Sequence, residues 1–146
     1  MDKYMTANAV FSKFSRTYMD LKKDLPIRPS EMAVLNIITL RGGRYTPLML
    51  AEILGVSKSM IAIHLRVLSQ KGYIYKEFSP NDKRSFYVLP TEEAIALTAD
   101  FKIKQSAHLK TIESAIGAEK FEELIQLMDQ TLPTLEELNE ELRHAK

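Results

Sequence analysis

The side chains best suited to chemistry in this sequence are basic ones gathered in the middle of the chain. Residues 55–90 contain six basic and two acidic side chains, a net charge of +4. Residues 111–146 contain three basic and nine acidic side chains, a net charge of −6. Because lysine and arginine bind phosphate through charge-assisted hydrogen bonds, the middle segment is suited to a polyanion. The competing interpretation, a random scatter of solvated charges, fits this contiguous separation less well. The six basic residues are Lys58, Arg66, Lys71, Lys76, Lys83 and Arg84.

Catalytic and metal chemistry find little support in the sequence. The chain has no cysteine, and no two of its histidines, His64, His108 and His144, are spaced i, i+4 as ligands on one helical face often are. The acidic residues cluster toward the C-terminus as solvated faces, and neither a phosphate-binding glycine loop nor a nucleophile elbow occurs. We therefore expect no enzyme, no metal site and no bound cofactor.

Length and composition indicate an ordinary globular protein. With 146 residues, 45% hydrophobic and 27% charged, the chain is long enough to bury a core of its own and too apolar to be disordered. No window approaches 18 apolar residues, and the N-terminus is polar rather than a signal segment, so no membrane partner is expected. Together with the absence of cysteine, this predicts a cytoplasmic location.

Two short helices joined by a tight turn should position the basic residues. Thr46 caps a helix that begins at Pro47, and Gly55 favours the left-handed turn that ends it. Ser57 then caps a second helix over 58–70. This pattern predicts a helix-turn-helix motif.

The second helix of that motif should present one apolar and one solvent-facing side. At about 100° per residue, Ile61, Leu65 and Leu68 fall together and should face the core. The opposite side could enter a major groove, where arginine binds a guanine edge or a phosphate and an apolar side chain contacts a thymine methyl group. Its residues are Ser59, Ala62, Ile63 and Arg66. Lys58, beside the helix start, should favour phosphate.

A β-hairpin with a basic tip should follow this helix. Residues 73–78 and 85–89 have strand composition, and the turn between them is polar and charged. Arg84 at the tip could enter a narrow minor groove. Asp82, two residues away, could pair with Arg84 and orient it rather than contact DNA itself. The alternative is an exposed ion pair of the ordinary kind, which stabilises a protein by about 0–1 kcal/mol.

The rest of the chain should be helical, which makes the fold mainly α with a small β-hairpin. Helices are predicted over 6–24, over 31–40 with Ser30 as N-cap, over 92–116 with Thr91 as N-cap, and over 119–143. Met32, Met49 and Met60 could line an adaptable ligand crevice, but core filling is the favoured role for each.

Residues 47–94 resemble the MarR (multiple antibiotic resistance regulator) family of winged helix-turn-helix repressors. The matching segments are Leu50-Ala51, Leu54-Gly55-Val56-Ser57-Lys58-Ser59, Leu65 with Leu68, Lys71-Gly72-Tyr73-Ile74, and Pro80-Asn81-Asp82-Lys83-Arg84 leading to Val88-Leu89-Pro90-Thr91-Glu92. The last of these, which includes the tip of the hairpin, is the most specific match. The flanking helices agree in number and order, so the resemblance extends over nearly the whole chain.

The resemblance implies a homodimer in which N-terminal (1–28) and C-terminal (93–146) helices of two chains interdigitate. Each chain then presents one winged helix-turn-helix domain (29–92) to half of a pseudo-palindromic duplex. It also implies repression of transcription that a small lipophilic or aromatic ligand relieves. The DNA contacts implied by the family pattern are Lys58, Ser59, Met60, Ala62, Ile63 and Arg66 in the helix, and Asp82, Lys83 and Arg84 in the hairpin.

One departure from the family pattern keeps a second function open. Family members usually have a polar or basic pair where this chain has Ala62 and Ile63, so side-chain hydrogen bonding is lost at the centre of the helix. The chain could instead be a winged-helix protein-interaction module with an eroded DNA-binding face.

The residues alone also suggest a dimer. Leucines recur at Leu135, Leu138 and Leu142 near the end of the chain, and a monomer would have few elements left to cover them. Packing of this last helix against the first helix of the same chain is the alternative.

Overall fold

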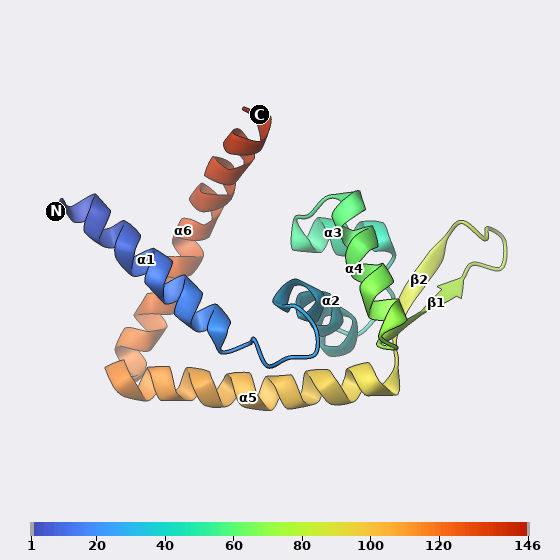
Figure 1. Ribbon diagram of the computed structural model, residues 1–146, viewed down its shortest axis with the longest axis horizontal. Coiled ribbons are helices and arrows are strands. Elements are labelled where there is room, and N and C mark those ends of the chain that lie inside the picture. Colours follow the sequence, from blue (N-terminus) through green and yellow to red (C-terminus); the bar gives the residue numbers. More distant parts are fainter. Residues whose placement is uncertain (1, 146) are drawn as a thin grey trace. The chain divides into compact units, whose positions relative to one another are not determined.

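The computed structural model describes residues 2–145, which form helices and one small antiparallel sheet (Figure 1). The predicted fold class is confirmed. The described elements are α1 (Lys3–Asp20), α2 (Pro29–Leu40), α3 (Pro47–Leu54), α4 (Lys58–Gln70), β1 (Ile74–Phe78), β2 (Phe86–Pro90), α5 (Glu92–Ile116) and α6 (Ala118–His144). The chain divides into two compact units, Met1–Ala99 and Asp100–Lys146, and α5 begins in the first and continues into the second.

The helix-turn-helix forms at the predicted residues. The Thr46 hydroxyl accepts a hydrogen bond from the amide of Met49 at 3.2 Å, and the Ser57 hydroxyl accepts one from the amide of Met60 at 3.1 Å. Gly55 between the helices has a φ of 67°, the left-handed conformation that only glycine adopts without strain. The axes of α3 and α4 consequently turn by 113°, within the usual range of this motif.

The start of α2 differs from the prediction, because Ser30 is not its N-cap. The helix begins at Pro29, whose ring already fixes a helical φ, and the N-cap is Arg28. The buried Glu31 carboxylate accepts a hydrogen bond from the amide of Arg28 at 2.9 Å. This reciprocal bond fixes the boundary, so Ser30 lies inside the first turn.

The hydrophobic core lies in the winged helix-turn-helix. Ile61, Leu65 and Leu68 of α4 are buried as predicted. Met32 also fills the core, but the same prediction is wrong for Met49 and Met60, which are 39% and 43% exposed. The buried apolar residues are Ile27, Met32, Val34, Leu35, Ile37, Ile38, Leu50, Ala51, Ile61, Leu65, Leu68, Ile74, Val88 and Ala94.

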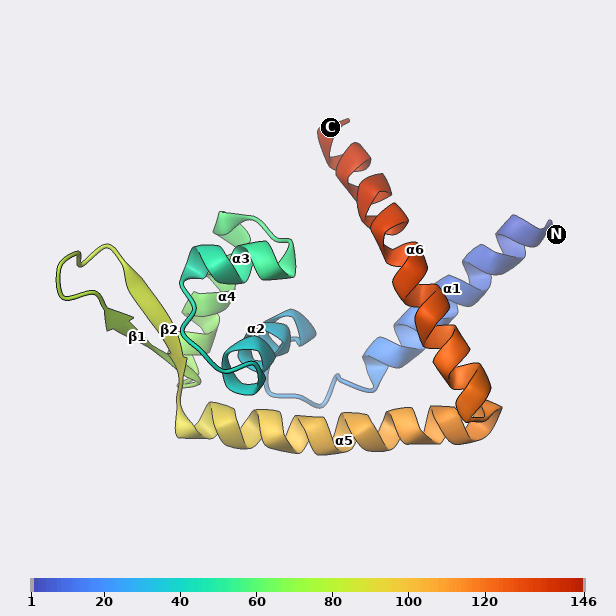
Figure 2. The ribbon, with the colours of Figure 1, turned by 180° about the vertical axis from the view of Figure 1, so that it is seen from behind.

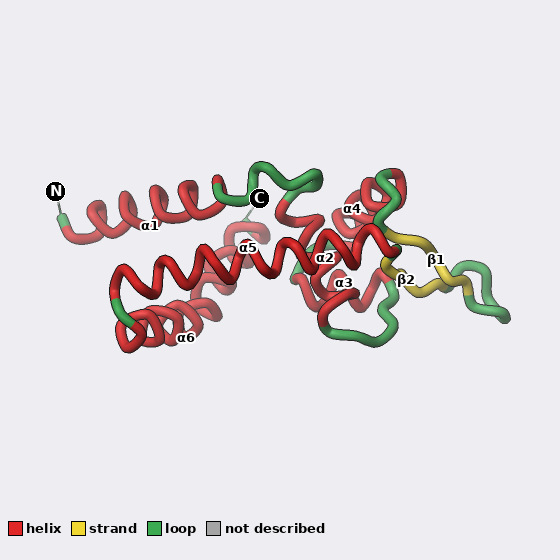
Figure 3. The backbone as a smooth tube through the Cα atoms, turned by 90° about the horizontal axis from the view of Figure 1, so that it is seen from below, coloured by secondary structure: helices red, strands yellow, loops and turns green. Residues whose placement is uncertain are grey.

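The two strands begin one residue later than predicted, at Ile74 and Phe86. The amide of Tyr73 bonds to the Leu68 carbonyl at 2.9 Å, so Tyr73 completes the C-terminal turn of α4 instead of joining the strand. The strands pair Lys76 with Val88, and the amide of Val88 also bonds to the Tyr45 carbonyl at 2.8 Å. Figures 2 and 3 show the hairpin extending beyond α3 and α4, with the loop between its strands farthest from these helices.

Over residues 2–145, no single helix is both long and apolar enough to cross a membrane. The bent pair of α3 and α4 meets the criterion only when its two helices are taken together, by length and composition. These are the two helices of the helix-turn-helix, and they contribute Leu50, Ile61 and Leu68 to the core.

Candidate nucleic-acid interface

The solvent-facing side of α4 carries every helix residue predicted to contact DNA. All six are exposed, while Ile61, His64, Leu65 and Leu68 between them are buried. The geometric part of the prediction, which side faces out, therefore agrees with the structure, and the contacts themselves stay a prediction. We call Ser59, Ala62, Ile63 and Arg66 the recognition face.

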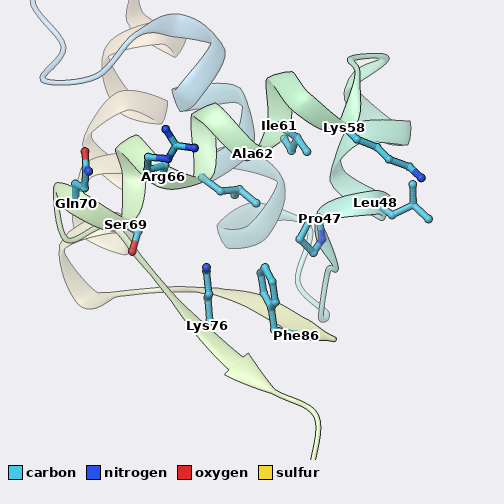
Figure 4. Close-up of a pocket in the computed structure, with 11 residues that line it drawn as sticks. Pro47, Leu48, Lys58, Ile61, Ala62, Arg66, Ser69, Gln70, Lys76 and Phe86 are labelled. Atoms are coloured by element: carbon cyan, nitrogen blue, oxygen red, sulfur yellow. The ribbon is translucent and has the colours of Figure 1, made fainter. Parts of the chain in front are cut away.

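A groove of about 630 Å³ lies between α4, the start of α3 and the hairpin (Figure 4). Lys58, Ala62 and Arg66, spaced four residues apart along α4, form one wall of it. Ser59, Met60 and Ile63 of the predicted site do not line the groove. We call this cavity the basic groove; its lining is Pro47, Leu48, Lys58, Ile61, Ala62, Leu65, Arg66, Ser69, Gln70, Lys76 and Phe86.

Lys76 is a groove residue that the sequence prediction of the site missed. In Figure 4 it extends from β1 toward α4 beside Phe86 of β2. Its ammonium nitrogen lies 4.7 Å from the centre of the Phe86 ring, a cation–π contact that holds the charge over the groove. A signal was present in the sequence: alternate strand residues share a face, so Lys76 must lie on the same face as the buried Ile74 two residues earlier.

The one acidic residue within β1 is neutralised by a partner outside the hairpin. Glu77 pairs with Arg44, which precedes α3, and the Arg44 guanidinium also lies 5.7 Å from the centre of the Tyr87 ring. This contact ties the hairpin to the segment before α3. The negative charge of Glu77 is thereby compensated near a surface suited to anions.

The hairpin tip holds Arg84 as the sequence suggested. One carboxylate oxygen of Asp82 accepts hydrogen bonds from the Arg84 backbone amide at 2.9 Å and from its Nε at 3.3 Å. The Arg84 side chain is nevertheless 93% exposed, so its guanidinium remains available to a ligand. Asp82, Lys83 and Arg84 do not line the basic groove, so the tip is a separate candidate contact.

The structure gives no support to a metal site. Among the residues it describes, no cluster of three or more histidine, cysteine, aspartate or glutamate side chains could hold a metal ion. His64 is only 8% exposed and packs inside the winged helix-turn-helix.

The helix-turn-helix, the hairpin after it and the basic groove between them define a winged helix-turn-helix protein. The model of the MarR family matches residues 25–85, which span α2 to the tip of the hairpin. Residues 25–85 are therefore similar to the MarR family, the family that the sequence resembles.

Comparison with solved structures extends the likeness over nearly the whole chain. Streptococcus pneumoniae FabT in complex with DNA has a TM-score of 0.74 at 20% identity, over 96% of this chain and 99% of that one. Streptomyces coelicolor PcaV in complex with its natural ligand has a TM-score of 0.76 at 15% identity, over 91% and 96%. The apo form of MarR from E. coli has a TM-score of 0.66 at 24% identity, over 91% and 98%. No curated protein matches the sequence.

Proposed function

We propose that this protein regulates transcription by placing α4 in the major groove of duplex DNA and the hairpin tip at the adjacent minor groove. The observation that carries the proposal is the alignment of Lys58, Arg66 and Lys76 around one groove. Within the described residues, no acidic side chain lines that groove. Three exposed positive charges on two facing elements suit an extended anion such as a phosphate backbone, and they suit an apolar protein surface or a small neutral molecule less well.

The recognition face and the basic groove have complementary roles in this proposal. The groove takes the phosphate backbone, which fixes the register of the protein but carries no sequence information. The recognition face then meets the base edges, where Arg66 has the donors to contact guanine. Arg84 at the tip adds a cation suited to a narrow minor groove.

We further propose that the protein binds a pseudo-palindromic duplex as a homodimer. Apolar side chains on α1 and α6 support this, because Phe11 is 74%, Leu135 56% and Leu142 64% exposed in the single chain. A two-fold dimer would cover these side chains and place two α4 helices about 34–36 Å apart, one helical turn of DNA.

Repression and its relief by a ligand complete the proposal. The support is the resemblance to the family, together with the ligand complex of PcaV, a protein of similar fold. We propose that a small lipophilic or aromatic molecule releases the protein from DNA. A protein with this function acts where the DNA is, which agrees with the cytoplasmic location expected from the sequence.

A second candidate function is a protein-interaction module with an eroded DNA-binding face. Ala62 and Ile63 favour it, because neither side chain can donate or accept a hydrogen bond at the centre of the recognition face. A module of this kind would bind duplex DNA weakly or not at all.

The salt dependence of binding to a labelled random-sequence duplex separates the two functions. For a DNA-binding protein, the logarithm of the association constant should fall linearly with the logarithm of the salt concentration. Arg66→Ala and Arg84→Ala should each weaken binding several-fold, and loss of one phosphate contact should make the slope shallower by about 0.9. Fluorescence anisotropy measures both quantities.

Arg143→Ala is the matched control, because it removes an exposed arginine from α6, outside the winged helix-turn-helix. It should leave the affinity and the slope nearly unchanged. Unchanged binding and slope in both the Arg66 and Arg84 variants would contradict the proposed interface and favour the interaction module.

A further inference from the structure

The recognition face is polar or basic at its ends and apolar in the middle. Ser59 lies near the start of α4, Arg66 lies two turns later, and Ala62 and Ile63 lie between them. Ile63 is 49% exposed, and the neighbouring Met60 is 43% exposed. The part of α4 best placed to meet base edges therefore has no hydrogen-bonding side chain at its centre.

The fold does not require an isoleucine at this position. Ile61, Leu65 and Leu68 already fill the inward side of α4, with 1%, 5% and 0% exposure. Ile63 contributes little to the core by comparison. Single exposed apolar residues are common in proteins. Here two adjacent ones, Ala62 and Ile63, lie together on the recognition face, and basic residues lie on either side of them. The flanking Lys58 and Arg66, which line the basic groove, favour duplex DNA as the occupant of this face.

The chemistry of the major groove singles out one partner for such a face. All four bases present donors or acceptors there, and covering those groups with an apolar side chain leaves them unsatisfied at a cost. Thymine alone presents a methyl group. We propose that Ala62 and Ile63 select 5-methyl groups, so that this protein recognises thymine at the centre of each half-site by apolar contact. This inference rests on the proposed DNA-binding function.

The spacing along α4 limits where that thymine lies. Ile63 and Arg66 are three residues apart, about 4.5 Å along a helix axis at 1.5 Å per residue. Successive base pairs are about 3.4 Å apart. The thymine contacted by Ile63 therefore lies within one or two base pairs of the base or phosphate contacted by Arg66.

Deoxyuridine tests the inference, because it keeps every hydrogen-bonding group of thymine and lacks only the methyl. Duplexes are first selected from a random pool by binding to the full chain. Each thymine of a selected duplex is then replaced singly by deoxyuridine. We expect binding to weaken about threefold to tenfold at one or two positions of each half-site, the size expected for one buried methyl contact, and little elsewhere. At those positions, 5-methylcytosine paired with guanine should bind better than cytosine.

Ile63→Ser removes the apolar contact, and Ile95→Ser is its matched control, because Ile95 is 52% exposed and lies on α5. The Ile63→Ser variant should bind thymine and deoxyuridine duplexes equally and retain the salt slope of the wild type. The control should retain both the discrimination and the slope. Circular dichroism should show both variants folded, because both side chains are exposed.

The outcomes separate this inference from the proposed function. Salt-dependent binding without any sensitivity to deoxyuridine, or unchanged discrimination in Ile63→Ser, overturns methyl recognition and leaves DNA binding intact. Selected duplexes without a thymine at the required spacing also overturn it. If the wild type shows no salt-dependent binding to any duplex, the proposed function and this inference both fall.

Discussion

The winged helix-turn-helix and the helices α1 and α6 differ in how much of their apolar surface they bury within the single chain. In α2, six of 12 residues are buried, including Val34 and Leu35. In α1 and α6, within residues 2–145, no residue is buried, although both helices carry apolar side chains at helical spacing. The winged part therefore completes its own core. The apolar faces of α1 and α6 remain to be covered by another surface, for which we propose a second copy of the chain.

The two regions also differ in charge. Residues 55–90 carry a net +4 and residues 111–146 a net −6. A polyanion attracts the first and repels the second, so the charge pattern favours the approach of residues 55–90 to a polyanion. In the proposed function, association would depend on α1 and α6, and DNA binding on the winged helix-turn-helix.

The largest expected effect comes from the core of the winged part. Leu35→Ala should lower the free energy of unfolding by about 2–5 kcal/mol, because Leu35 is fully buried and its loss leaves a cavity. Leu135→Ala, the same substitution at a position 56% exposed, should change the stability of the monomer by less than about 0.5 kcal/mol. Urea denaturation at low and high protein concentration measures both.

This pair tests whether the two regions differ as described. The loss in Leu35→Ala should be the same at every protein concentration. The loss in Leu135→Ala should appear only at concentrations where chains associate. Equal losses from the two variants at high dilution would contradict the comparison.

The next effect concerns association. Leu135→Glu combined with Leu138→Glu places charges on the apolar face of α6 and should weaken dimerisation at least about 30-fold, which is about 2 kcal/mol. Sedimentation velocity over a dilution series gives the dissociation constant. Asn139→Glu, on the same helix, adds a charge at a polar position and should leave the dimer intact. A double variant that dimerises like the wild type would show that α6 packs within its own chain instead.

The smallest expected effect comes from Ser57, where two substitutions should affect the stability of the fold and duplex binding differently. Ser57→Ala removes the N-cap of α4 and should lower the free energy of unfolding by about 1 kcal/mol. Ser57→Asp keeps a capping oxygen and should restore most of the stability, while its negative charge should weaken duplex binding. Urea denaturation and fluorescence anisotropy on the same samples test both expectations. Loss of stability in Ser57→Asp equal to that in Ser57→Ala would show that the hydroxyl itself is required.

The sequence predicted most elements to within a few residues, and the errors have local causes. Ser30 is a good N-cap by type, yet the bond from Arg28 to Glu31 fixed the boundary elsewhere. Tyr73 has strand composition, yet its amide is used to end α4. Met49 and Met60 have apolar side chains, yet the core was already filled by other residues of α3 and α4. In each case, a specific hydrogen bond or an already filled core outweighed the preference that the residue type indicates.

What the sequence determined by itself is the helix-turn-helix and the side of α4 that faces solvent. Caps, glycine turns and a 3.6-residue apolar period act over a few neighbouring residues, so they can be recognised without knowing the rest of the fold. What only the tertiary structure decided is the basic groove. Lys76 lines the same groove as Lys58 and Arg66 of α4, and Arg44 pairs with Glu77, 33 residues away in the sequence. Both arrangements exist because the strands of the hairpin pair with each other and pack against the helices. Such contacts depend on the register of strand pairing and on the shared core.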